Sequence, residues 1–126
     1  EKVLRETAAR VTPMDVEETL RKADAIRGQF EKKGPLGRFV ADVKVLLSMV
    51  QDTWSHTYRE VPYWTIAAIV AALLYVINPF DAIPDAIPIV GQLDDAAVVA
   101  ACLALVRRDL QRYREWKLAR QSGENN

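Results

Sequence analysis

Four aspartates, whose side chains could bind a cation or a basic group, fall within one short stretch of the sequence. Asp81 and Asp85 stand four residues apart, and Asp94 and Asp95 follow after an apolar segment. Carboxylates that lie close together repel one another unless they hold a cation, a proton or a basic partner. Oxygen ligands without His or Cys favour Mg²⁺ or Ca²⁺ over zinc. The stretch therefore predicts an acidic site, and its ligand would be a metal ion or a basic side chain.

A simpler interpretation is that these aspartates only cap helices. Asp81 and Asp85 each precede a stretch long enough for one helical turn, and Asp94 and Asp95 stand where the last helix is expected to begin. The spacing is not that of an EF-hand loop. A basic side chain such as Arg107, or one from a partner, would neutralise the cluster as well as a metal would. Capping, a basic partner and a divalent metal site are all compatible with the sequence.

Prolines and a glycine determine the shape of the connection that carries the aspartates. They are Pro79, Pro84, Pro88 and Gly91. Proline cannot continue a regular helix, so the chain must turn here. The flanking segments, 62–77 and 96–106, are strongly apolar and contain no charged residue. We therefore expect a helical hairpin that brings the two pairs of aspartates close together.

The remaining segments show the spacing of amphipathic helices. Thr12 and Pro13 form a helix start signal, with Thr as the N-cap and Pro in the first turn. Apolar residues repeat at helical spacing up to Gly34-Pro35, and a second such helix is expected from about Pro35 to Arg59. The last helix is expected over about 93–121. No segment alternates as a strand would.

These elements predict an all-α fold, a compact bundle of four to five helices around a central apolar hairpin. We expect one domain over residues 1–126. Its parts are amphipathic helices over 1–60, the hairpin over 62–106, an amphipathic continuation of the last helix over 107–121 and a disordered polar tail over 122–126. The sequence begins at Glu1 and shows no signal-peptide pattern, which leaves open a segment before it.

Composition and single residues argue against several classes of function. The 17 basic and 17 acidic residues balance, so we expect no nucleic-acid partner. Cys102 is the single cysteine and lies in an apolar run, which favours a buried side chain in a reducing compartment. His56 is the single histidine, and no zinc site or His-dependent triad can be assembled around it. We expect no catalytic residue and no cofactor, with Mg²⁺ or Ca²⁺ at the four aspartates as the alternative.

The apolar hairpin raises the question of a membrane. A spanning helix needs about 20 predominantly apolar residues, and both apolar runs are shorter. We expect the hairpin to be buried in the protein. In the alternative, a re-entrant hairpin would place the acidic turn at its tip and Arg59, Arg107 and Arg108 at its base, with carboxylates at a costly depth. The tryptophans are expected in the core or at a partner surface rather than in a membrane belt.

The run from Tyr75 to Asp95, YVINPFDAIPDAIPIVGQLDD, resembles the signature of the YkvA-like domain (DUF1232), a bacterial family of unknown function. The shared pattern is Tyr-x-x-x-Pro-x-Asp-x-Ile-Pro-Asp-x-Ile-Pro-x-x-Gly-x-x-Asp-Asp. With its helices the resemblance covers about Pro62 to Val106 and not the N-terminal half. Ala82 and Ala86 stand where members often carry larger apolar residues. The resemblance implies a helical hairpin, frequent membrane association and no established catalytic chemistry.

Together these features favour a non-enzymatic interaction module that presents the acidic turn to a basic protein partner in the cytoplasm. One version is an immunity or antitoxin-type protein, by analogy with other small neutral helical proteins. The first alternative is a peripheral protein at the inner face of the membrane that uses the hairpin. The second is a divalent-metal hydrolase that uses the four aspartates. The sequence does not fix the oligomeric state.

Overall fold

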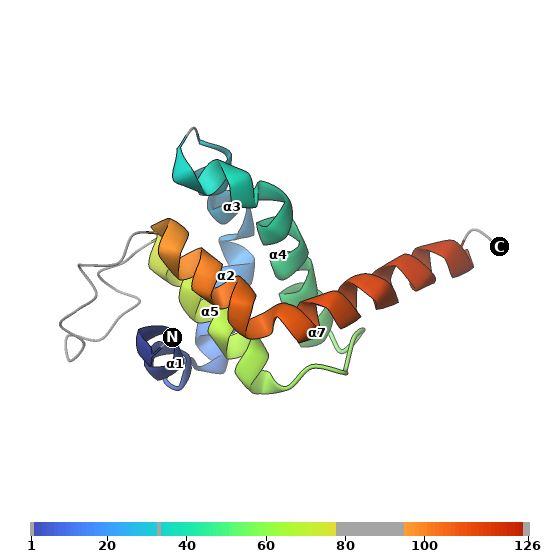
Figure 1. Cartoon of the computed structure of the whole chain (residues 1–126). Helices are drawn as coiled ribbons and strands as arrows, with labels where there is room; N and C mark the ends of the chain where they lie inside the picture. The colour runs from blue at the N-terminus through green and yellow to red at the C-terminus, as the bar shows by residue number, and fades with distance from the viewer. Residues whose placement is uncertain (1, 33, 78–94, 125–126) are drawn as a thin grey trace.

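The computed structural model describes residues 2–32, 34–77 and 95–124 (Figure 1). Over these residues the regular structure is entirely helical, so the predicted all-α bundle is confirmed. Its elements are α1 (Lys2–Ala8), α2 (Pro13–Arg21), α3 (Ala23–Glu31), the 3-10 helix η1 (Pro35–Phe39), α4 (Val40–Trp54), α5 (Tyr63–Ile77) and α7 (Asp95–Glu124). The described part thus has more helical segments than the four to five predicted.

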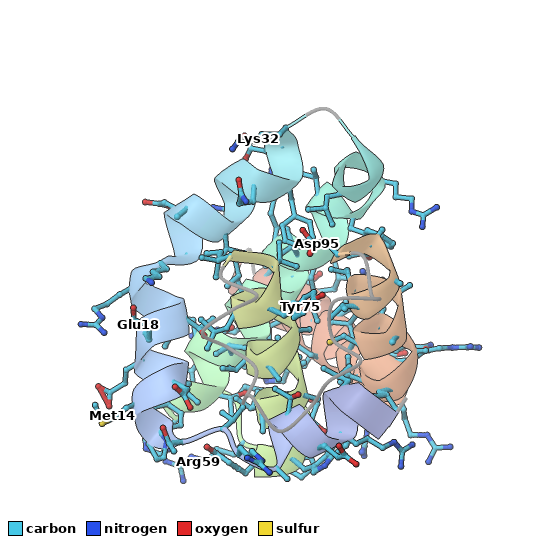
Figure 2. All side chains as sticks on the ribbon, turned by 90° about the vertical axis from the view of Figure 1, so that its left-hand side faces the viewer. Met14, Glu18, Lys32, Arg59, Tyr75 and Asp95 are labelled. Carbon is cyan, nitrogen blue, oxygen red and sulfur yellow. The ribbon has the colours of Figure 1, made fainter. Side chains whose placement is uncertain are left out.

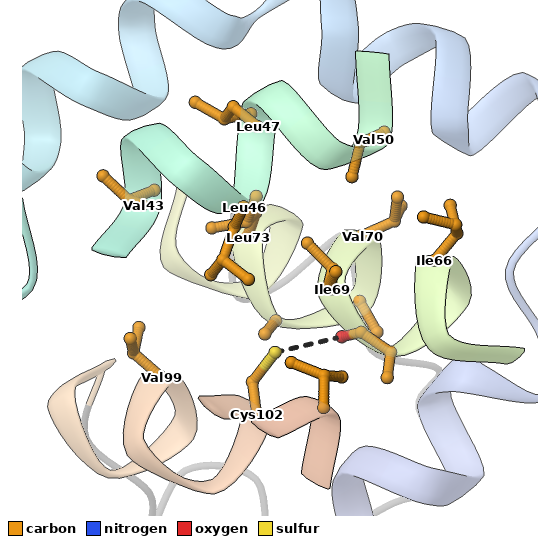
Figure 3. Close-up of a cluster of buried hydrophobic side chains, with 14 of the residues drawn as sticks. Val43, Leu46, Leu47, Val50, Ile66, Ile69, Val70, Leu73, Val99 and Cys102 are labelled. Carbon is orange, nitrogen blue, oxygen red and sulfur yellow. Dashed lines mark hydrogen bonds between the residues drawn. The ribbon is translucent and has the colours of Figure 1, made fainter. Parts of the chain in front are cut away.

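Helix α5 forms the centre of the bundle. Its residues from Thr65 to Leu73 are all buried, as a helix without charged side chains requires. Helices α1, α2, α3, α4 and α7 all contact it. Figure 3 shows Leu46 and Val50 of α4 on one side of Ile69 and Leu73, with Cys102 of α7 on the other side. The prediction that the apolar hairpin is buried at the centre is therefore confirmed for α5, whereas the apolar start of α7 buries one face and leaves Ala97, Ala100 and Ala104 exposed.

Helices α5 and α7 run antiparallel, side by side (Figure 1). Near the start of α5, Thr65 donates a hydrogen bond to the Asp109 carboxylate, with 2.6 Å between Oγ1 and Oδ2. Further along α5, the Ala68 carbonyl accepts from the Cys102 thiol at 3.8 Å. As the residue number rises along α5, that of its partner on α7 falls. This pairing fixes the register of the two helices independently of the connection between them.

The helix that was expected from Pro13 to Gly34 is divided at Lys22 into α2 and α3. Its start is as predicted, with Thr12 as the N-cap, and Asp15 completes a reciprocal capping box with it. No proline or glycine stands at the break, so the division follows from packing rather than from a helix-breaking residue. With the bend in place, Val16 and Phe30 are both fully buried. The exposed side chain of Arg21 pairs with Glu18, one turn earlier on α2.

Three helix ends differ from the prediction. The helix expected from about Pro35 to Arg59 starts as the 3-10 helix η1, so α4 begins only at Val40. It ends at Trp54 rather than at Arg59, because the backbone turns sharply at His56. Helix α7 continues to Glu124, three residues into the segment predicted as a disordered tail. Figure 1 shows this helix extending well beyond the rest of the bundle. No proline stands after Gly91, so no residue in this segment forbids the helix from continuing.

Candidate functional site

The predicted acidic turn falls mostly outside the described residues. That holds for Asp81, Asp85 and Asp94 and for the turn-shaping residues Pro79, Pro84, Pro88 and Gly91. Asp95 is the first residue of α7 and is half-buried in its first turn, where the helix dipole favours a carboxylate. Within the described ranges, no three His, Cys, Asp or Glu side chains gather as metal ligands. The metal and partner hypotheses for the four aspartates therefore stay predictions.

At the opposite end of the hairpin, aromatic and apolar side chains are exposed. Tyr63 and Trp64 open α5 and are 46% and 41% exposed, and Met14 at the start of α2 is 79% exposed. The Tyr63 hydroxyl donates to the Val11 carbonyl at 3.1 Å, which ties α5 to the chain just before Met14. Burial raises the pKa of Tyr63, and the Asp15 carboxylate nearby raises it further. The hydrogen bond holds Tyr63 close to the start of α2, at the same end of the molecule as Met14.

Basic side chains lie at the same end. Arg10 is exposed and immediately precedes Val11. Arg59 is exposed in the connection between α4 and α5. Figure 2 shows Met14 and Arg59 at one end of the molecule and Lys32 at the opposite end. We call the surface formed by Met14, Tyr63, Trp64, Arg10 and Arg59 the hairpin base.

The backbone that carries Arg59 closes helix α4 in an unusual way. His56 has a φ of 65° in the left-handed region, where glycine is the usual residue. Its N–H donates to the Thr53 carbonyl at 3.1 Å, and the Thr57 N–H donates to the Asp52 carbonyl at 2.9 Å. These two bonds are those of a Schellman motif. Histidine at this position costs conformational energy that glycine would avoid, roughly 1 kcal/mol.

An open groove of about 500 Å³ lies between this helix end and the start of α5. Its lining includes Thr53, Trp54, His56, Arg59, Val61 and Ile66, and it reaches Tyr58 and Tyr63. The Thr53 hydroxyl oxygen is buried and has no hydrogen-bond partner; among the described residues it is the one such side-chain atom. The groove therefore combines apolar and aromatic walls with an imidazole and a guanidinium.

Comparison with known proteins places the chain in a family. The family model described as "Protein of unknown function (DUF1232)" matches residues 65–101. The "Uncharacterized membrane protein YkvA" of Bacillus subtilis (strain 168) is 32% identical over 79 residues, which cover 63% of this chain and 74% of the relative. The chain belongs to the YkvA-like DUF1232 family. The predicted resemblance is confirmed. No solved structure matches the chain.

The DUF1232 segment corresponds to the centre of the bundle. It covers α5 from Thr65 onward and the start of α7. The hairpin base and the groove lie at its edge, because Tyr63 and Trp64 immediately precede the match and the groove residues from Thr53 to Val61 come earlier in the chain. In the described part of this family member, no helix is long and apolar enough to cross a membrane. Helix α5, the first part of the family segment, is thus buried from Thr65 to Leu73, and the exposed aromatic side chains immediately precede it.

A second polar cluster joins α4 to α7. The Asp52 carboxylate accepts hydrogen bonds from the Tyr113 hydroxyl at 2.5 Å and from the Lys117 ammonium at 2.9 Å. The Tyr113 hydroxyl also bonds with Ser48. Burial raises the pKa of Tyr113, and the hydrogen bond to Asp52 raises it further. The hydrogen bond to Asp52 likewise raises the pKa of Lys117. Both shifts favour the protonated donors. The cluster therefore suits a structural link between α4 and α7 rather than acid-base chemistry.

Aromatic rings continue this link toward the α4–α5 connection. Tyr58 packs edge-to-face on Tyr113, with 5.2 Å between ring centroids, and lies 4.8 Å from Trp116. Burial raises the pKa of Tyr58, and Glu60 raises it further. The prediction that Trp116 packs rather than contacting lipid thus fits the structure. Because this contact fixes Tyr58, it also positions the connection that carries His56 and Arg59.

The single cysteine is not a reactive group in this structure. Cys102 is fully buried between α5 and α7, and burial raises the pKa of its thiol from 9.0 to about 12. The thiolate is the nucleophilic form, and it is scarce at neutral pH with such a pKa. The predicted role of a small buried hydrophobic side chain is confirmed.

Proposed function

We propose that the folded bundle binds the surface of an anionic membrane through the hairpin base. The observation that carries this proposal is the exposure of two consecutive aromatic side chains, Tyr63 and Trp64, beside the arginine at position 59. Tyr and Trp favour the membrane–water interface, because an apolar ring and a polar hydrogen-bonding atom can each meet a suitable environment there. The proposal is for a protein that lies on the membrane and not across it.

The other side chains of the hairpin base fit the same role. Met14 is the most exposed of the large hydrophobic side chains in the described part, at 79%. Transfer of such a side chain from water into lipid is favourable, because its apolar surface leaves water. Arg10 and Arg59 would be attracted to a surface of anionic lipids, against the repulsion of Asp15 and Glu60 nearby. The anionic lipids of the cytoplasmic leaflet give it a negative surface potential, which agrees with a location at the inner face of the membrane.

The sequence-based alternative has the hairpin itself enter the bilayer, whereas the present proposal keeps it buried and places only the hairpin base in contact with lipid. Lipid contact along α5 would require the surrounding helices to separate, because Thr65 to Leu73 are covered by protein. Contact at the hairpin base needs no rearrangement. The Bacillus subtilis relative, whose name describes a membrane protein, supports association with a membrane but does not identify the surface used.

Vesicle flotation tests the proposal. The full chain is mixed with vesicles of phosphatidylglycerol and phosphatidylcholine, or of phosphatidylcholine alone, and the protein that floats is measured. We expect binding to the anionic vesicles and a clear loss in Trp64→Ala and Tyr63→Ala. Leu118→Ala is the matched control, because Leu118 is a 64% exposed hydrophobic residue on the far part of α7. Equal flotation of all variants, or none by the parent chain, would contradict the proposal.

A further inference from the structure

The groove at the end of α4 has the chemistry of an anion site joined to an apolar surface. Arg59 lines it, and its Nε donates to the His56 carbonyl at 3.2 Å. This bond holds the guanidinium in place while its two terminal nitrogens still have hydrogens to donate. In the described part of the chain, no carboxylate forms an ion pair with Arg59. A fixed guanidinium without an acidic partner suits the paired oxygens of a phosphate or carboxylate.

The position of His56 points in the same direction. A residue held in the left-handed region is conformationally strained unless it is glycine, and such strain often marks a functional position. The imidazole lines the groove together with Arg59, three residues further along the chain. An exposed imidazole can donate a hydrogen bond to the same anion that the guanidinium binds. Glycine, the usual residue here, would leave the groove without this donor.

The remaining walls fit a ligand that carries apolar groups next to its anion. Trp54, Val61 and Ile66 form the apolar part of the lining. The volume of about 500 Å³ is within the range of sites that bind small organic molecules and exceeds what a lone phosphate needs. The buried Thr53 hydroxyl still lacks a partner, and a polar ligand atom in the groove would supply one after rotation of its side chain. The Glu60 carboxylate, which raises the pKa of Tyr58, does not line the groove.

We propose that this groove binds one anionic phospholipid, with its phosphate on Arg59 and His56 and its glycerol and first acyl carbons against Trp54, Val61 and Ile66. The inference rests on the proposed membrane function, because Tyr63 lies both in the hairpin base and at the groove. The exposed aromatic side chains would place the protein on the lipid surface. The groove would then select a phosphate-bearing headgroup rather than negative charge in general.

Titration with a water-soluble lipid separates the groove from the surface. Dihexanoyl phosphatidic acid, kept monomeric, is added to the full chain while amide and side-chain NMR signals are followed. We expect saturable shifts at Thr53, His56 and Arg59. Arg59→Gln should weaken binding about tenfold or more, because two charge-assisted hydrogen bonds are lost. His56→Gly keeps the backbone conformation and should weaken binding by a smaller factor. Lys32→Gln removes a cation at the opposite end and should change nothing.

The source of the phosphate is distinguished by titrating inorganic phosphate and glycerol phosphate in the same way. Weaker binding of both, by about tenfold or more, supports a site that also uses the acyl carbons. Equal affinity for inorganic phosphate and the lipid would overturn the assignment to a phospholipid. Absence of shifts in the groove, with flotation still dependent on Trp64, would overturn the groove site and leave the proposed function intact. Shifts in the groove without any flotation would overturn the proposed membrane function and leave the groove as a phosphate-binding site.

Discussion

The Tyr113 hydroxyl of α7 donates to the Asp52 carboxylate of α4 across 2.5 Å, although the two residues are 61 positions apart in the sequence. Tyr113 is 1% exposed and the Asp52 side chain 17%, so this hydrogen bond is partly shielded from solvent. It joins the helix that ends at the groove to the helix that packs along the core. Because Tyr113 also supports Tyr58, the bond acts on the connection that carries Arg59.

Removal of the Tyr113 hydroxyl should destabilise the protein. Tyr113→Phe keeps the ring in place but takes away the donor to Asp52, and we expect a loss of about 1–2 kcal/mol in the free energy of unfolding. Urea unfolding followed by circular dichroism measures this change. The matched control is Arg114→Gln, which breaks the more exposed pair with Asp42 and should cost less than about 0.5 kcal/mol. Similar losses of stability in both variants would show that the Tyr113 hydrogen bond stabilises the fold no more than an exposed ion pair does.

Stability should fall in alkaline solution, and Cys102 should account for part of the fall. Its thiol has a pKa of about 12 in the folded protein and an ordinary value of 9.0. Between these values the unfolded chain has released the proton and the folded chain has kept it. The unfolded state therefore binds fewer protons, and the free energy of unfolding decreases as pH rises, by at most about 1.4 kcal/mol per pH unit for this group. Tyr113 and Lys117, whose pKa values are also raised, act with the same sign.

Cys102→Ala separates the thiol from these other groups. The variant loses some stability at pH 7, because a small cavity replaces the sulfur. From about pH 9 upward its free energy of unfolding should decrease less steeply than that of the parent chain. Urea titrations at several pH values between neutral and about 11 measure both slopes. Parallel curves for the two proteins would contradict a burial-shifted thiol.

The centre of the fold could be predicted because the sequence of α5 leaves few alternatives. A run of residues from Thr65 to Ile77 without one charge can be stable only inside protein or lipid, and it is too short to span a bilayer. The capping box at Thr12 was also predictable, because both of its members lie within four residues. Local signals of this kind need no knowledge of the tertiary structure.

The groove could not be predicted, because it depends on one backbone conformation and on contacts between distant residues. No glycine or asparagine stands near position 56, so nothing in the sequence indicated that α4 would end before Arg59. The bond between Asp52 and Tyr113 joins residues that no local pattern relates. Arg59 was noted at the base of the hairpin, but its place beside His56 follows only from this turn.

Capping and partner binding by the acidic turn predict different effects of the same substitutions. If Asp81 and Asp85 only cap helices, then Asp81→Ala and Asp85→Ala should each cost about 1 kcal/mol in the free energy of unfolding. If they contact a basic protein partner, both variants should keep the stability of the parent chain and bind that partner more weakly. The sequence-based hypothesis of a basic protein partner predicts the second result. Affinity purification from the native organism identifies the partner, and calorimetry measures its binding. A loss of stability with unchanged affinity would support the capping interpretation instead.

His56→Gly should stabilise the protein while weakening the proposed lipid site. Glycine accepts a φ of 65° without steric cost, although it also raises the entropy of the unfolded chain, so we expect a net gain of about 0.5–1 kcal/mol. Thermal unfolding measures the gain. Ser55→Gly is the matched control at the preceding residue, where φ is −85° and glycine offers no relief, and it should lower stability. A loss of stability in His56→Gly would mean that the imidazole makes contacts worth more than the strain. A gain together with weaker phosphatidic acid binding would show that the side chain serves the ligand at the expense of the fold.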